Sequence, residues 1–335
     1  MKELDQIINS NYPVEVIKLE KIKNAYKVTT TEGLKCFKAS KYDTGQYKFI
    51  IQVLTHLIAN NYENIPEIYK TIHGESFIGY EDRYGFLCDW IDSREADFEN
   101  PIDLKLCIDT LGKLHLASRG FQYNEVSNIR YLFGKWIQRF KKRCDELLYF
   151  KAFIVNKEKN LVTEFDRMYL KAFEKHYKQG IKAIKDLENS SYYSVMEKHK
   201  HSSCFCHHDT ANHNFLITSE LEVFLIDFDY CIYDTFLHDL GSIIIRNLKY
   251  GNWSFSKMEY ILNIYCKSIP ISKEEIHIMF CFMEFPQDFW QIGLQYYIEN
   301  KIWSEEVFLK KLKHVLVDAP ERNEFLSDYE GKGII

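Results

Sequence analysis

The chain opens with apolar and polar positions that alternate as in β-strands, and this pattern covers residues 14–39. Glu32-Gly33 lies between two of these runs, where the turn of a β-hairpin is expected. The apolar positions then change to helical spacing over residues 44–60. Strand-like runs return over residues 67–91, with a turn predicted near Tyr84-Gly85. This part of the chain therefore predicts a small antiparallel sheet with one helix.

Helical spacing dominates the rest of the chain. We expect helices over Ile102–Ala117, 128–150 and 161–187, and a mostly helical pattern from 235 to 317. Short strand-like runs interrupt this pattern over residues 204–228. A small sheet-rich lobe followed by a large helical lobe predicts an α+β fold, with the two-lobed order that is typical of protein kinases.

The length of the chain suits two lobes. Its 335 residues exceed the roughly 250–300 at which a single hydrophobic core stops growing. No repeat and no Gly/Ser-rich tract separates independent modules. We expect residues 1–91 to form a nucleotide-binding N-terminal lobe and residues 92–335 to form a helical lobe that carries the catalytic loop, residues 204–229.

The composition and the N-terminus favour a globular protein of the cytoplasm. A hydrophobic content of 46% and a charged content of 27% are typical of globular domains. The net charge of −5 gives no reason to expect nucleic acid or an acidic membrane as a partner. The N-terminus lacks the apolar core of a signal peptide, so we expect a cytoplasmic protein without a membrane partner. In that compartment its nine cysteines are expected to remain thiols.

Candidate chemistry concentrates in the interruption of the helical pattern. The sequence from His207 to Asn214 contains His-x-Asp-x-x-x-x-Asn, with Asp209 as its aspartate, and an apolar run then ends at Asp227. Phosphoryl transfer needs one carboxylate beside the attacking hydroxyl, and oxygen ligands that hold Mg²⁺ against the phosphates. The ordered combination of these residues predicts a kinase-type site.

Two alternatives to a kinase-type site stay open. Asp and Asn in loops are often turn residues that bond their own backbone, and an Asp after an apolar run is often simply a strand end. A zinc site is the second alternative, although Cys-x-Cys lacks the usual spacing of zinc ligands. Its candidate ligands are His199, His201, Cys204, Cys206, His207 and His208.

Residues 204–240 resemble the aminoglycoside phosphotransferase and choline kinase superfamily. The resemblance rests on the motif of His207, Asp209 and Asn214, on the metal-binding aspartate at Asp227, and on a later Asp239-Leu240. In that superfamily the later Asp-Leu pair braces the catalytic loop.

More narrowly, residues 5–320 resemble the CotS family of bacterial spore-coat proteins. The matching segments are spread along the chain. They are Thr31-Glu32-Gly33 with Phe37-Lys38, Leu114-His115 with Gly120-Phe121, the run from Ile226 to Asp229, the run from Phe285 to Trp290, and Trp303-Ser304-Glu305-Glu306.

These resemblances imply ATP and Mg²⁺ as cofactors and assign roles by position. Asp209 would be the catalytic base, and His207 would act with it, more as a brace of the loop than as a proton donor. Asn214 and Asp227 would be the Mg²⁺ ligands. Lys38 would contact the α- and β-phosphates, with a solvated strand lysine as the alternative.

The same resemblance places the hinge that meets adenine at the end of the strand-like runs. Its cofactor-binding residues would be Asp89, Trp90 and Ile91, through their backbone groups. We expect the ring of Trp90 to pack rather than to stack on the base.

Two departures from the superfamily bear on activity. Residues 20–26 contain no glycine where backbone amides should cradle phosphate. The interior of the helix predicted over 44–60 contains no acid to pair with Lys38, so that Asp43 or Glu63 would have to take that place. A less well positioned lysine would lower nucleotide affinity or rate.

Two candidate functions remain, and they belong to different classes of protein. The first is a spore-coat-associated, Mg-ATP-dependent phosphotransferase that acts on a hydroxyl of a small molecule or a coat protein. The alternative is a pseudokinase, catalytically weak or inactive, that serves as a structural coat component. In both cases the protein would be made in the mother-cell cytoplasm and assemble into the coat beside other coat proteins. A candidate docking surface consists of Phe285, Phe289, Trp290, Tyr296, Tyr297 and Trp303, of which at least half are expected to be core.

Overall fold

The computed structural model describes residues 4–122, 130–299 and 301–332. The chain folds into two compact units, each built from separated segments. The first unit takes the chain up to Tyr131 together with Ser203–Tyr233 and Lys267–Ile269. The second unit takes the remaining segments. The predicted boundary between residues 91 and 92 stays a prediction.

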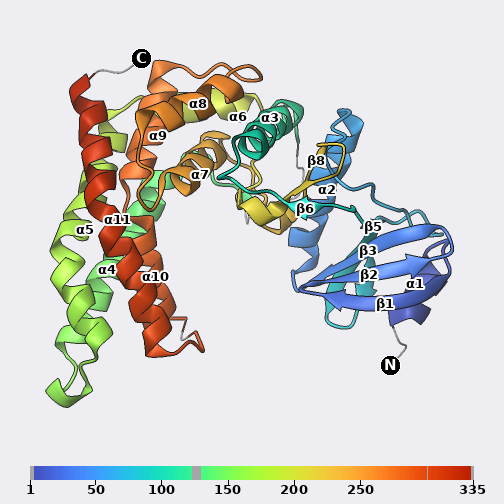
Figure 1. Cartoon of the computed structure of the whole chain (residues 1–335), viewed down its shortest axis with the longest axis horizontal. Helices are drawn as coiled ribbons and strands as arrows, with labels where there is room; N and C mark the ends of the chain where they lie inside the picture. The colour runs from blue at the N-terminus through green and yellow to red at the C-terminus, as the bar shows by residue number, and fades with distance from the viewer. Residues whose placement is uncertain (1–3, 123–129, 300, 333–335) are drawn as a thin grey trace. The chain divides into compact units, whose positions relative to one another are not determined.

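The first unit is built on a five-stranded antiparallel sheet of order β1-β2-β3-β5-β4 (Figure 1). Thr31-Glu32 forms the turn of the hairpin between β2 and β3. Gly33 follows with a φ of 114°, a backbone conformation that would be strained in a residue with a side chain. The elements are α1 (Leu4–Asn11), β1 (Val16–Ile22), β2 (Ala25–Thr30), β3 (Gly33–Ser40), α2 (Thr44–Ala59), β4 (Ile78–Tyr80) and β5 (Arg83–Asp89).

The predicted turn near Tyr84-Gly85 is wrong. Both residues lie inside β5, and the turn is made by Glu81-Asp82, where Glu81 has a φ of 53°. Gly85 is a glycine for a different reason, because a Cβ at that position would collide with the ring of Phe37 across the sheet. The glycine therefore serves close packing and not chain reversal.

Helix α2 follows the prediction for residues 44–60. Asp43 is its N-cap, with an extended backbone and a side chain that accepts a hydrogen bond from the amide of Gln46. A separate cluster beside the sheet buries residues of α1 against apolar residues of the strands. Its buried members are Leu4, Ile8, Tyr12, Val28, Phe37, Ile78 and Leu87.

A second, three-stranded sheet belongs to the same unit and has the order β6-β7-β8. Its strands are short, and turns of 3₁₀-helix flank the last two. These elements hold the candidate chemistry. They are β6 (Arg94–Glu95), α3 (Pro101–Ala117), η3 (Asn212–Asn214), β7 (Phe215–Ile217), β8 (Val223–Leu225) and η4 (Phe228–Tyr230).

In its described residues, the second unit contains helices and no β-strand. The predicted helix over 128–150 begins only at Trp136, and residues 128 and 129 lie outside the described part of the chain. Helix α5 starts after a capping box of Thr163 and Asp166. The elements are α4 (Trp136–Val155), η2 (Lys159–Leu161), α5 (Glu164–Asn189), α6 (Tyr192–His201), α7 (Leu237–Leu248), α8 (Phe255–Tyr265), α9 (Lys273–Glu284), α10 (Gln287–Tyr297) and α11 (Glu305–Lys332).

The aromatic residues proposed as a docking surface mostly fill this unit. Phe285 and Phe289 are buried, and the ring of Phe289 stacks on Tyr169 with centroids 4.2 Å apart. Trp290, Tyr296 and Tyr297 are half-buried and pack against the core cluster of α4, α5, α10 and α11. Only Trp303 is exposed among the six, with 38% of its surface accessible. The six residues therefore do not form one exposed face.

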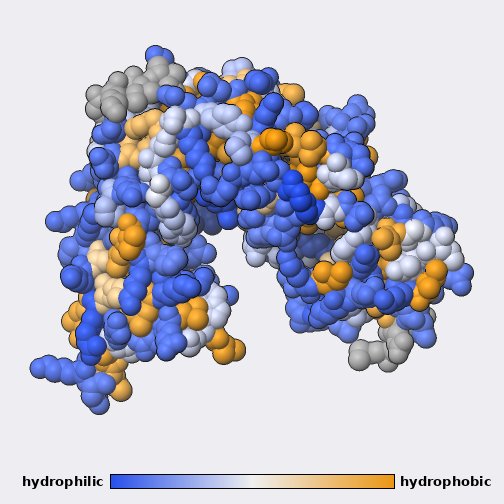
Figure 2. Space-filling model, in the orientation of Figure 1, coloured by the Kyte–Doolittle hydropathy of each residue, from blue (hydrophilic) through white to orange (hydrophobic). Residues whose placement is uncertain are grey.

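The surface carries charged and polar residues with scattered apolar ones between them, as Figure 2 shows for one face. In the described residues, no helix is both long and apolar enough to cross a membrane. All nine cysteines are described, and none of them forms a disulfide.

Candidate nucleotide and metal site

The predicted catalytic loop is held in place by the ring of His207. Nε2 of this buried histidine lies 2.9 Å from the carbonyl oxygen of Ile226, and the amide of Asp209 donates to Nδ1 at 3.4 Å. The next residue, His208, has a φ of 71°, so the backbone turns sharply before Asp209. The ring thus connects the loop to the end of β8, which is the contact expected of a brace.

Asn214 and Asp209 are in direct contact. The side-chain amide of Asn214 donates to the carbonyl oxygen of Asp209 at 3.0 Å and to its carboxylate Oδ2 at 3.1 Å. Asn214 is almost completely buried, and its backbone carbonyl oxygen accepts the amide of Ile226 at 3.0 Å. The loop therefore fixes the Asp209 carboxylate and, through Ile226, the residue that follows, Asp227.

Asp227 directly follows Ile226 and has a left-handed backbone, with φ 67° and ψ 58°. Few residues other than glycine, asparagine and aspartate adopt this conformation readily. The carboxylate Oδ1 of Asp227 lies 2.6 Å from Nζ of Lys38, on β3. The structure thus joins two predicted site residues that are 189 positions apart in the sequence.

Lys38 has a second carboxylate partner in Asp229. Its Nζ lies 2.8 Å from Oδ1 of Asp229, whose Oδ2 accepts a hydrogen bond from the hydroxyl of Ser40 at 2.9 Å. Arg130 holds the backbone nearby, because its Nη1 donates to the carbonyl oxygens of Asp229 and Cys231, both at 2.8 Å. Sequence reasoning assigns no role to Ser40, Asp229 or Arg130. The only feature of the sequence that could have indicated one of these residues is the second aspartate of Asp-Phe-Asp, which is Asp229.

The charges of this cluster support one another. Burial alone would lower the pKa of Lys38, but the carboxylates of Asp229 and Asp227 outweigh it and raise the pKa of the amine. Burial would likewise raise the pKa of Asp227, and the Lys38 ammonium outweighs it, so that the pKa of this carboxyl is lowered. Lys38 is therefore a largely buried, fully charged ammonium, and not a solvated strand lysine.

The predicted hinge follows β5. The carboxylate of Asp89 accepts from Nζ of Lys35 at 2.9 Å and from the hydroxyl of Tyr69 at 2.8 Å. The half-buried ring of Trp90 has Nζ of Lys27 4.9 Å from its centroid. These side chains are thus engaged by the protein itself, and so are the amides of Asp89 and Trp90, which donate to the carbonyl oxygens of Glu67 and Leu34 at 3.0 and 3.3 Å. The predicted contact of Asp89, Trp90 and Ile91 with adenine therefore rests on their remaining backbone groups.

Two of the histidines in the zinc alternative bind protein groups instead. His199 has Nδ1 2.6 Å from the hydroxyl of Thr235 and Nε2 2.6 Å from a carboxylate oxygen of Glu275. Both nitrogens of His207 have partners, in the carbonyl oxygen of Ile226 and the amide of Asp209. The nitrogens of both rings are therefore occupied, which disfavours the zinc site.

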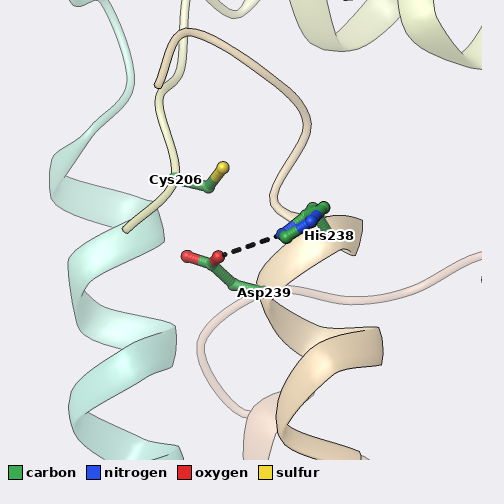
Figure 3. A group of neighbouring side chains, drawn as sticks. All are labelled: Cys206, His238 and Asp239. Atoms are coloured by element: carbon green, nitrogen blue, oxygen red, sulfur yellow. Dashed lines mark ion pairs between the residues drawn. The ribbon is translucent and has the colours of Figure 1, made fainter. Parts of the chain in front are cut away.

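Asp239, the later aspartate of the superfamily pattern, is buried in α7. Its carboxylate Oδ1 lies 3.6 Å from Nδ1 of the neighbouring His238, and this contact becomes an ion pair when His238 is protonated (Figure 3). Figure 3 also draws Cys206, which belongs to the other compact unit. A bracing role of Asp239 for the catalytic loop stays a prediction.

The fold has close counterparts among solved structures. An aminoglycoside phosphotransferase from Alicyclobacillus acidocaldarius is similar over 99% of this chain and 97% of its own, with a TM-score of 0.84 and 20% identity. A spectinomycin phosphotransferase, solved with ADP and spectinomycin, is similar over 98% and 97% of the two chains, with a TM-score of 0.65 and 16% identity. The chain therefore has the two-lobed, protein-kinase-like α+β fold that the sequence predicts.

The chain belongs to the spore-coat family whose model is described as "Spore coat putative kinase YutH", and the match covers residues 5–329. It is also 24% identical over 303 residues to spore coat protein S of Bacillus subtilis, which covers 90% of this chain and 85% of that protein. The predicted resemblance to spore-coat and phosphotransferase proteins is thus confirmed.

Proposed function

We propose that this protein is a spore-coat-associated phosphotransferase that transfers the γ-phosphoryl group of Mg-ATP to a hydroxyl of a small molecule or a coat protein. The observation that carries the proposal is the contact of Lys38 with Asp227, beside a loop in which Asn214 fixes Asp209. The burial of this lysine against two carboxylates of a distant segment favours a role in the site over that of a solvated strand lysine.

The donor atoms suit the proposed metal. Asp227 offers an ionised carboxylate and Asn214 an amide oxygen, and Mg²⁺ prefers hard oxygen ligands of this kind. When bound, the metal would neutralise charge on the phosphates. Lys38 would bind phosphate oxygens, and the hinge backbone at Asp89, Trp90 and Ile91 would bind adenine.

In the proposed reaction, Asp209 orients the acceptor hydroxyl and takes its proton. The acceptor oxygen forms a bond to the γ-phosphorus, the bond from that phosphorus to the β,γ-bridging oxygen breaks, and ADP leaves. His207 and Asn214 hold Asp209 in its place in the loop. The spectinomycin phosphotransferase solved with ADP supports a nucleotide as the cofactor of this fold.

The family supports the proposed location. We place the protein in the mother-cell cytoplasm during synthesis and in the spore coat afterwards, where other coat proteins are its partners. Membership of a spore-coat family and the relation to spore coat protein S support this assignment.

A thermal-shift measurement with ATP tests the nucleotide site. A ligand that binds only the native protein raises its apparent stability, by about 2.7 kcal/mol when its concentration is a hundred times Kd. We expect ATP to raise the melting temperature, and Mg²⁺ to increase that rise. Equal melting curves with and without Mg-ATP would refute the proposal.

A structural pseudokinase is the second candidate, and one observation favours it. Strands β1 and β2 are joined by Lys23-Asn24 alone, where a phosphate loop would need several backbone amides. The two candidates differ for spores that carry Asp209→Ala. An enzyme predicts that this variant has the coat defect of a deletion, whereas a scaffold predicts a normal coat.

A further inference from the structure

Lys38 stands between two carboxylates that differ in their surroundings. The side chain of Asp227 is 38% exposed, whereas those of Asp229 and Lys38 are only 18% and 17% exposed. The cluster carries two negative charges and one positive charge. A cation that binds the more open carboxylate of Asp227 would therefore leave Lys38 with the more buried one.

The helix that follows β3 along the chain contains no acid. Helix α2 runs from Thr44 to Ala59 without an aspartate or glutamate. Asp43, the nearest acid before it, uses its carboxylate to cap the helix at Gln46. Asp229 supplies a negative charge from another segment instead, at 2.8 Å from the amine.

Asp229 is itself held firmly in place. Each of its carboxylate oxygens has a separate partner, because Oδ1 faces Lys38 and Oδ2 accepts from Ser40. Its backbone carbonyl oxygen accepts from Arg130, whose guanidinium lies 5.2 Å from the ring centroid of Tyr42. A carboxylate fixed on both oxygens is suited to orienting a lysine and poorly suited to changing partners.

We propose that Asp229 is the positioning residue of Lys38 and keeps its ammonium aligned for phosphate when Asp227 is engaged by the metal. The inference rests on the proposed function for its role in nucleotide binding. The two aspartates of Asp-Phe-Asp thus have separate roles, because Asp227 binds the metal and Asp229 orients the lysine.

The first experiment measures ATP affinity by calorimetry in Asp229→Asn and Asp227→Asn. We expect Asp229→Asn to weaken Mg-ATP binding about ten-fold. The Mg²⁺ concentration at which half of the ATP-saturated protein has bound Mg²⁺ should stay unchanged. Asp227→Asn should raise that Mg²⁺ concentration instead. A raised Mg²⁺ requirement in Asp229→Asn would make Asp229 a metal ligand and overturn the inference.

A double-mutant cycle with Lys38→Met tests whether Asp229 acts through the lysine. In the Lys38→Met background, Asp229→Asn should cause no further loss of ATP affinity, because the group that it positions is gone. Asp229→Glu should restore part of the affinity. Independent, additive losses would contradict a positioning role.

A second measurement does not depend on nucleotide. Asp229→Asn removes the charged partner that holds the Lys38 amine at 2.8 Å, so acetic anhydride should acetylate this amine faster in the variant than in the wild-type apo protein. Asp82→Asn is the matched control, since Asp82 pairs with exposed Lys41. Unchanged reactivity of Lys38 would overturn the inference. Failure of ATP binding with a changed reactivity would instead overturn only the proposed function.

Discussion

Strand β3 carries two largely buried lysines, each held by aspartate, and the two arrangements differ in origin. Lys35 pairs with Asp89, its direct partner in the register of β3 and β5, at 2.9 Å. Lys38 pairs with Asp227 and Asp229, which lie far away in the sequence. Because the lysines are three positions apart on a strand, their side chains leave opposite faces of the sheet.

Strand pairing accounts for one of these ion pairs and not for the other. The sheet brings Asp89 to Lys35 by strand pairing alone, and Tyr69 completes the cluster. No strand pairing brings Asp227 to Lys38. That contact depends on the loop braced by His207 and on the left-handed backbone of Asp227, a conformation that aspartate tolerates. This convergence of charges from distant segments is the basis of the proposed function.

The largest expected effect is on nucleotide binding. Lys38→Met should weaken Mg-ATP binding about 10- to 100-fold, because a charged hydrogen bond to phosphate is lost. Calorimetry measures this change, and Lys41→Met, at an exposed lysine just after β3, is the control. If Lys35→Met weakened binding as much as Lys38→Met, the proposed distinction between the two lysines would be lost.

Lys35→Met should act on stability instead. It leaves Asp89 with Tyr69 alone, and we expect the free energy of unfolding to fall by about 1–2 kcal/mol. The rise in melting temperature caused by Mg-ATP should stay as in wild type. Urea unfolding with and without Mg-ATP measures both quantities, and a lost Mg-ATP effect would place Lys35 in the site.

Asp43→Ala tests the partner that the sequence suggests for Lys38. Loss of this N-cap should destabilise the protein by about 1 kcal/mol, because the amide of Gln46 loses its acceptor. Affinity for Mg-ATP should not change. Asp43→Asn, which can still cap the helix, is the matched control, and a fall of affinity in both variants would restore Asp43 as the partner.

The smallest expected effect is on the stability of the protein at acidic pH. The pKa of Asp227 is lowered in the folded protein, so this carboxylate contributes stability above its unfolded pKa of about 3.9 and loses it as the pH falls through the folded value. The contribution should be a few tenths of a kcal/mol to about 1 kcal/mol, because the side chain is partly solvated.

Urea midpoints from about pH 6 down to about pH 2.5 measure this contribution. Asp227→Asn should flatten the loss of stability below about pH 4, and asparagine also tolerates the left-handed backbone. Identical pH profiles for wild type and Asp227→Asn would show that the Lys38 pair contributes nothing to the acid response.

Much of the fold is accessible from periodicity. The change from strand-like alternation to helical spacing predicts the sheet, helix α2 and the helical remainder. The error at Gly85 has a physical cause, because a glycine can serve either a turn or close packing. Only the folded sheet shows that Phe37 packs against Gly85 from the neighbouring strand.

Only part of the candidate site can be predicted from the sequence. The spacing of Asp209, Asn214 and Asp227 in one short segment predicts that they lie near one another. Local reasoning places the partner of Lys38 in or beside the nearest helix, where the structure has none. Asp229 stands two positions after Asp227, but only the folded chain shows that the two carboxylates converge on one amine.

The separation of Lys38 and Asp227 has a consequence for synthesis of the chain. A ribosome that adds about 5–20 residues per second needs roughly 10–40 s to pass from one residue to the other. Throughout that interval the emerging sheet contains a lysine whose counter-charges do not yet exist. The site can therefore be completed only after residue 229 has been added, and a chain truncated before residue 227 would lack both carboxylate partners of Lys38.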